Sequence, residues 1–102
     1  MQTKFHFEGL PGADLICKGL MDIADGRETV ASLLVLIGAP RLRRLGLSIP
    51  ETQLQPEHAL YALLAQAEPD SAHSRYHALI RTLVSFERAA EKLAHSRPAF
   101  SN

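Results

Sequence analysis

The side chains whose types and spacing could bind a charged ligand are arginines and lysines, and they fall into two groups. The first group follows a break in the longest apolar run: Arg41, Arg43 and Arg44. The second group is spaced at seven and four residues and is followed by a histidine three residues later: Arg81, Arg88, Lys92 and His95. These spacings place the second group along one side of a helix. Both groups are candidate contacts for the phosphates of RNA or DNA.

The charge distribution offers a second interpretation of both groups. Formal net charge is zero, whereas a nucleic-acid-binding chain usually has a strong positive balance. Lys and Arg against Asp and Glu give −2 for residues 1–39 (three against five), +3 for 40–50, −4 for 51–70 and +3 for 71–102 (five against two). The acidic segment 51–70 could therefore pair with the basic groups within the chain or between subunits.

Arg88 and His95 also have the arginine-to-histidine spacing of the HEPN ribonucleases, which this pair resembles. The resemblance implies RNA cleavage at a dimer interface. It covers two residues only, and Ala89 replaces the polar residue that usually follows the arginine. Any amphipathic helix would place both residues on one face.

A pair of histidines forms the candidate metal site. His73 and His77 are one helical turn apart, and with Asp70 just before them they could supply three ligands to zinc. The Glu that lies between the histidines of hydrolytic zinc enzymes is missing, and a fourth ligand is not evident. We therefore expect no metal or cofactor.

The single cysteine, Cys17, excludes an internal disulfide. It falls beside the apolar face of a predicted helix, with no charged group at helical spacing to lower its pKa, so we expect a small buried hydrophobe rather than a nucleophile. The N-terminal residues lack the apolar core of a signal peptide, and no apolar run approaches the roughly 20 residues of a membrane span. We expect a cytoplasmic protein without a membrane segment.

The element that must position these residues is the apolar run 30–37, VASLLVLI, whose only polar residue is Ser32. Leu and Ala outnumber β-branched residues there, which favours a buried helix over a buried strand. Asp25 and Glu28 have the spacing of a capping box, which predicts a helix start at residue 25. Pro40 ends the helix and begins a short turn, with Leu42 inward and the three arginines of 40–46 fanned outward.

The rest of the chain predicts an all-α fold, a small bundle of four main helices plus the short basic turn. A helix opens at Pro11 or Gly12, and Gly19 on its apolar face allows close approach of another helix. A loop over 47–55 returns Leu47 and Ile49 to the core. Two more helices span 56–67 and 72–96. We expect one domain over 1–102, with an extended arm at 1–10 and a flexible tail at 97–102. The alternative is an α+β fold in which the N-terminal segment is a strand that pairs across a dimer.

These observations predict a small, non-catalytic interaction or regulatory protein. The last helix is roughly 35 Å long, which is more than the body of a domain of this size needs. We therefore expect first a homodimer, and a further protein could bind to it. The alternative is a nucleic-acid-associated protein that uses the two basic groups.

Overall fold

This computed structural model describes residues 7–96, with the backbone alone for residues 95 and 96. This part of the chain contains five α-helices and one short 3-10 helix. The helices are α1 (Ala13–Ala24), α2 (Val30–Ile37), α3 (Ala39–Arg44), α4 (Pro56–Ala67) and α5 (Ala72–Ser96), with a 3-10 turn over Pro69–Ser71. Residues 7–96 contain no strand, so the predicted all-α bundle is confirmed. Most of the predicted arm and the whole predicted tail lie outside the described residues.

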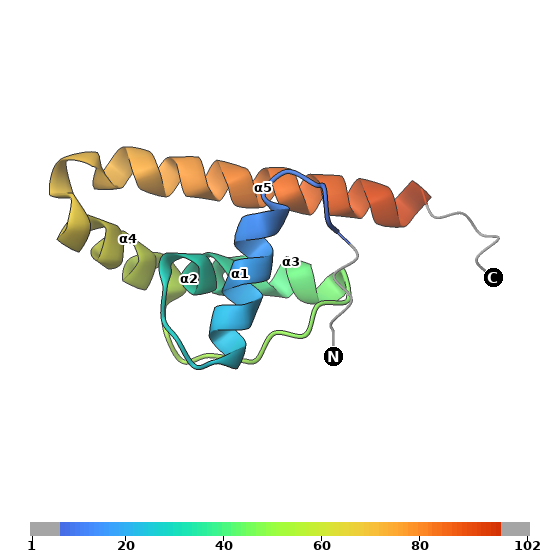
Figure 1. Cartoon of the computed structure of the whole chain (residues 1–102), viewed down its shortest axis with the longest axis horizontal. Coiled ribbons are helices and arrows are strands. Elements are labelled where there is room, and N and C mark those ends of the chain that lie inside the picture. The colour runs from blue at the N-terminus through green and yellow to red at the C-terminus, as the bar shows by residue number, and fades with distance from the viewer. Residues whose placement is uncertain (1–6, 97–102) are drawn as a thin grey trace.

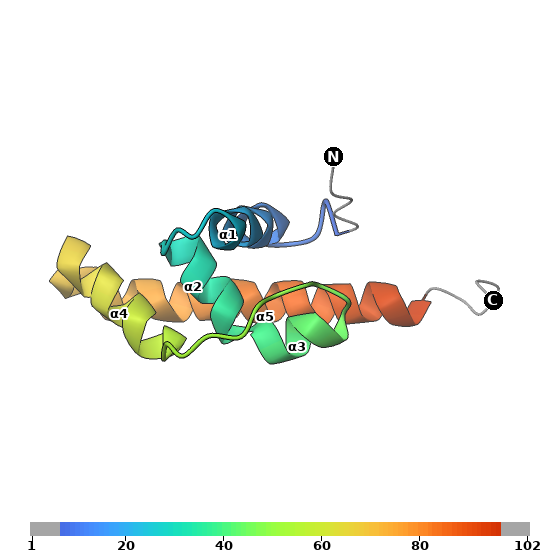
Figure 2. The same ribbon diagram turned by 90° about the horizontal axis from the view of Figure 1, so that it is seen from below.

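Helix α2 is the centre of the packing. Figure 2 shows it between α1 and α5, and Figure 1 shows α5 running along one edge of the whole molecule. Leu33, Leu34 and Val35 are fully buried because neighbours cover α2 on more than one side. Leu60 and Leu64 of α4 and apolar residues of α5 complete the core. The prediction of a buried helix rather than a strand is confirmed.

The start of α2 differs from the prediction. Asp25 is the C-cap of α1, and the N-cap of α2 is Thr29. The Thr29 hydroxyl accepts a hydrogen bond from the Ser32 backbone N–H (3.1 Å), and the Ser32 hydroxyl accepts one from the Thr29 N–H (2.8 Å). The predicted Asp25–Glu28 box is wrong because Gly26, with φ 74°, turns the chain out of α1 at that point.

Asp22, which the sequence pattern did not single out, joins α1 to this cap. It is 2% exposed, accepts a 2.6 Å hydrogen bond from the Thr29 hydroxyl and lies 3.2 Å from Lys18 Nζ. The hydrogen bond from Thr29 is the main reason why the pKa of Asp22 lies below its ordinary value. The corner between α1 and α2 is therefore held by a buried, fully bonded carboxylate.

Thr29→Ala tests this corner. The change removes the N-cap and one hydrogen bond to Asp22, so we expect the free energy of unfolding to fall by about 1–2 kcal/mol. Glu28→Ala is the matched control, because Glu28 is exposed and belongs only to the box predicted from sequence. Urea denaturation of both variants measures the difference. An equal loss in Glu28→Ala would contradict the observed cap.

The remaining segments follow the prediction closely. Pro40 lies in the first turn of α3, where its missing N–H costs nothing, and Ile49 of the following loop is buried. Phe7 packs edge-on against Phe86 of α5, with ring centroids 5.7 Å apart. None of the helices within residues 7–96 is long and apolar enough to cross a membrane.

Candidate functional site

Arg41, the first of the basic residues after the break, is bound to two carboxylates of α5. Its Nε and Nη2 donate to the two oxygens of Glu91 at 2.6 and 2.8 Å, a bidentate pair. Its Nη1 donates to Glu87 Oε1 at 3.3 Å. The expected internal partner was the acidic segment 51–70. For Arg41, α5 supplies the carboxylates instead, whereas Glu51 of that segment pairs with Arg43 at 3.6 Å.

Glu87 is buried at the junction of α2 and α3. The residue is 4% exposed, and burial is the main reason why the pKa of its carboxyl is raised, with Arg41 acting in the opposite direction. A Cβ on Gly38 would lie 2.8 Å from Glu87 Oε2 and 2.8 Å from Leu83 Cδ1. Gly38 therefore allows α5 to approach the break closely enough for Arg41 to reach Glu87.

Arg43 is also engaged, in this case with the loop that follows α3. It donates to the carbonyl oxygens of Ile49 (2.8 Å) and Pro50 (2.9 Å) and lies 3.6 Å from a Glu51 oxygen. The prediction that all three arginines point outward is therefore wrong for Arg41, which joins α3 to α5, and for Arg43, which joins α3 to the following loop. Arg44 is exposed as predicted.

The second basic group lies on the exposed side of α5. Arg81, Arg88 and Lys92 are all exposed, and we call these three residues the basic face. At about 100° per residue, Arg88 and Lys92 fall within about 20° of Arg81 around the helix. Other residues within about 40° are uncharged or histidine: Ser74, His77 and Ser85. The basic face therefore carries no carboxylate among the described residues of α5.

The candidate metal ligands do not come together as a site. The rings of His73 and His77 meet edge to face, with centroids 4.4 Å apart. Asp70 lies in the 3-10 turn before them and is exposed. Within the described part of the chain, no group of three His, Cys, Asp or Glu side chains is placed to hold a metal ion.

The other two candidates are the Arg88–His95 pair and Cys17. Arg88 is exposed on α5, while the His95 side chain lies outside the described residues, so the arrangement of this pair is not tested. Cys17 is a free thiol that is partly buried on α1. Its place beside the apolar face of that helix is the one expected of a small hydrophobe.

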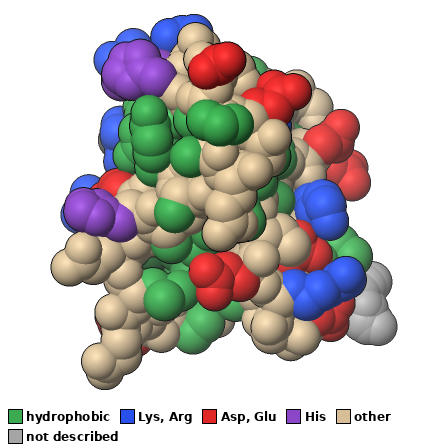
Figure 3. Space-filling view, turned by 90° about the vertical axis from the view of Figure 1, so that its left-hand side faces the viewer, with side chains coloured by type: hydrophobic (Ala, Val, Ile, Leu, Met, Phe, Trp, Pro, Cys, Tyr) green, Lys and Arg blue, Asp and Glu red, His purple; other side chains and the backbone are tan. Residues whose placement is uncertain are grey.

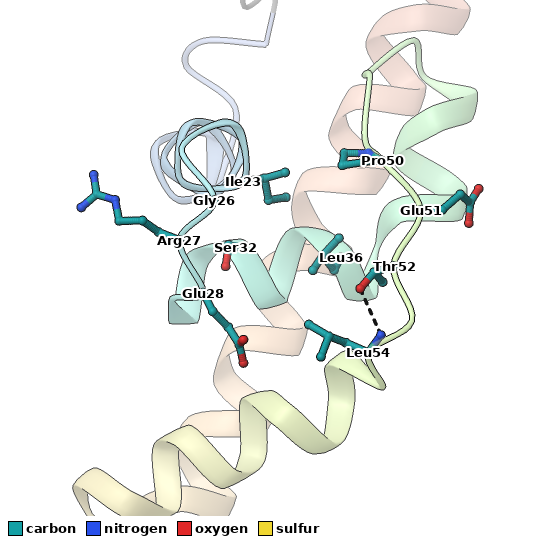
Figure 4. A pocket seen from close by; sticks show the side chains of 10 residues that line it. All are labelled: Ile23, Gly26, Arg27, Glu28, Ser32, Leu36, Pro50, Glu51, Thr52 and Leu54. Atoms are coloured by element: carbon teal, nitrogen blue, oxygen red, sulfur yellow. Dashed lines mark hydrogen bonds between the residues drawn. The ribbon is translucent and has the colours of Figure 1, made fainter.

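A small hollow of about 210 Å³ opens between α2, the end of α1 and residues 50–54 (Figure 4). Ile23, Leu36 and Leu54 form its apolar wall, with charged side chains such as Arg27 at its rim. Among the residues that line this hollow, Ser32 is polar and buried, and its hydroxyl already accepts a hydrogen bond from the Thr29 backbone N–H in the cap of α2. We place no function in this hollow.

An aromatic group that sequence analysis missed lies where α4 meets α5. Tyr61 of α4 and Tyr76 of α5 have ring centroids 5.7 Å apart, and His77 lies 5.8 Å from Tyr76. Burial is the main reason why the pKa of Tyr76 is raised. A signal was present in the sequence, because Tyr61 falls outside the apolar stripe of its helix. In the structure this side chain is 40% exposed.

Comparison of the chain with known protein families, with curated proteins and with solved structures finds no match.

Proposed function

We propose that this chain is a small binding protein without catalysis of its own, and that it binds nucleic acid through the basic face of α5. One observation carries the proposal: α5 separates its charges. Its two described carboxylates, Glu87 and Glu91, turn toward Arg41, and the cations of the basic face turn toward solvent. A cytoplasmic location, as expected from the sequence, is part of the proposal.

This separation of charges explains how the basic residues can attract phosphates although two glutamates lie among them in the sequence. Read along the chain, Glu87 and Glu91 flank the basic residues and should weaken their attraction for phosphates. In the fold, both carboxylates face Arg41 on another side of the helix, and its guanidinium offsets one of their two negative charges. A chain with zero net charge can therefore still present a surface of one sign.

The length of the basic face also suits a phosphate backbone. Arg81 and Lys92 are eleven residues apart in a continuous helix, which is about 16 Å at 1.5 Å per residue. Arg88 lies between them. Three cations along such a line can contact successive phosphates of one strand, while the exposed helix leaves room for the strand to approach.

The test replaces all three cations with alanine and measures binding of labelled RNA and DNA pools by fluorescence anisotropy. We expect Arg81→Ala/Arg88→Ala/Lys92→Ala to bind about 10- to 100-fold more weakly at moderate salt, because about three phosphate contacts are lost. Arg75→Ala is the matched control, since Arg75 is an exposed cation of the same helix about 120° from Arg81. Equal binding by the triple variant and this control would overturn the proposal.

A homodimer is the second candidate, and the shape of α5 favours it. The molecule measures 50 × 26 × 22 Å, and Figure 1 shows the C-terminal end of α5 extending past α3. Leu93 in this part is 40% exposed. A second copy of the chain that packs along this end would bury it.

We expect light scattering after size exclusion to give twice the mass of one chain, and Leu93→Glu to return the mass to that of one chain, because a charge in the interface would be desolvated. Met21→Glu is the control, since Met21 is 61% exposed on α1. The mass of a single chain at every concentration would contradict the dimer.

A further inference from the structure

The aromatic side chains at the junction of α4 and α5 form a connected series. Tyr61 contacts Tyr76, Tyr76 contacts His77, and His77 contacts His73, with centroid distances of 5.7, 5.8 and 4.4 Å. Tyr61, His73 and His77 are exposed, while Tyr76 is half-buried behind them. Exposed rings supported by other rings are held in place and so lose little freedom when a flat ligand stacks on them.

This series leads directly to the basic face. His77 lies one helical turn before Arg81 and within about 40° of it around α5. Figure 3 views this end of the molecule and shows histidine side chains beside both exposed hydrophobic side chains and Lys or Arg side chains. A ligand bound along the basic face can therefore continue onto the rings without leaving the surface.

The rings also border an open hollow. Glu57, His58, Tyr61, Ala62 and Tyr76 line a space of about 500 Å³ that is open to solvent. Tyr61 and Tyr76 supply flat apolar surface, and the Glu57 carboxylate can accept hydrogen bonds from N–H groups. This combination suits a nucleobase, which is flat and carries such groups at its edge. A phosphate would be repelled by Glu57.

We propose that the nucleic acid is single-stranded, with its phosphates on the basic face and one or more bases stacked on Tyr61 and the neighbouring rings. This inference rests on the proposed function. Bases of a duplex are already stacked on one another, so their faces are hidden from protein rings. Only a strand with unpaired bases can use both the cations and the aromatic series.

The experiment compares a labelled single strand of about 15 nucleotides, oligo(dT) or oligo(U), with a duplex of equal length. We expect the single strand to bind at least about tenfold more tightly. Tyr61→Ala should weaken single-strand binding about tenfold, because one stacking contact is lost, and should leave duplex binding and the salt dependence unchanged. Tyr61→Phe keeps the ring and should bind like the unchanged protein. Met21→Ala, a loss of exposed apolar surface on α1, is the control.

Intrinsic fluorescence gives an independent readout. The chain has no Trp and two Tyr, and both tyrosines belong to this series. We expect oligo(dT) to quench tyrosine emission, after correction for absorption, in proportion to the fraction of protein bound. A titration that saturates in anisotropy without changing tyrosine emission would overturn the stacking.

The inference and the proposed function fail differently. The inference is overturned if single strand and duplex bind with equal affinity, or if Tyr61→Ala binds like Tyr61→Phe. In either case, a loss of binding in the triple variant of the basic face still supports the proposed function. Unchanged binding by the triple variant overturns the function and the inference with it.

Discussion

Gly19→Ala is expected to lower the free energy of unfolding by about 2 kcal/mol, although alanine forms helices better than glycine. A Cβ at this position would lie 2.4 Å from the Ala31 carbonyl oxygen and 2.5 Å from Val35 Cγ2. The oxygen belongs to the backbone of α2 and cannot rotate away, so α1 and α2 must separate. Overpacking of this kind costs about 3 kcal/mol, and helix propensity returns about 1 kcal/mol.

The sign of the change makes this a sharp test. If Gly19 had no packing role, alanine would stabilise the protein by about 1 kcal/mol. Ala24→Gly is the matched control, because Ala24 is exposed in the last turn of the same helix and its loss should cost no more than about 1 kcal/mol. Denaturant unfolding followed by circular dichroism measures both. Any stabilisation by Gly19→Ala would contradict the close contact between α1 and α2.

Arg41→Ala is expected to lower the melting temperature by about 5–10 °C, because it leaves the Glu87 carboxylate buried without its cation. Arg44→Ala, a loss of an exposed cation from the same helix, should leave the melting temperature almost unchanged. Adding Glu87→Gln to Arg41→Ala should recover part of the loss, since a neutral amide is cheaper to bury than a charge.

The loss caused by Arg41→Ala should also depend on pH. Burial raises the pKa of Glu87, and without Arg41 the pKa of this carboxyl rises further. The folded variant then binds more protons than the unfolded chain above the ordinary pKa of 4.5, so its stability falls as pH rises through that range. We expect a smaller difference from the unchanged protein near pH 4 than near pH 8. A difference that is largest at pH 4 would contradict a buried Glu87.

Much of the fold could be predicted from local patterns. The apolar run 30–37 predicted a buried helix, Pro40 predicted its end, and Gly19 predicted a close helix contact. These features depend on side-chain type and on backbone restrictions within a few residues. The capping box was placed four residues early because Asp25 and Glu28 also fit the pattern, and only the turn at Gly26 decides between the two.

The site was harder to predict because its pairs are distant in sequence. Arg41 is separated from Glu87 and Glu91 by 46 and 50 residues, so no spacing rule could show which carboxylates it binds. The same contact shows that Glu87 and Glu91 lie on the side of α5 that faces Arg41. Tyr61 and Tyr76 meet only because α4 and α5 pack side by side. Helical periodicity alone did place Arg81, Arg88 and Lys92 on one side of α5.

The salt dependence of nucleic-acid affinity tests the basic face most directly. The logarithm of the association constant should fall linearly with the logarithm of salt concentration, with a slope of roughly −2 to −3 for three phosphate contacts. Each of the single variants Arg81→Ala, Arg88→Ala and Lys92→Ala should reduce the steepness by about one, and Arg75→Ala should not change it. A slope that is the same in all four variants and the unchanged protein would show that the basic face does not bind the phosphates.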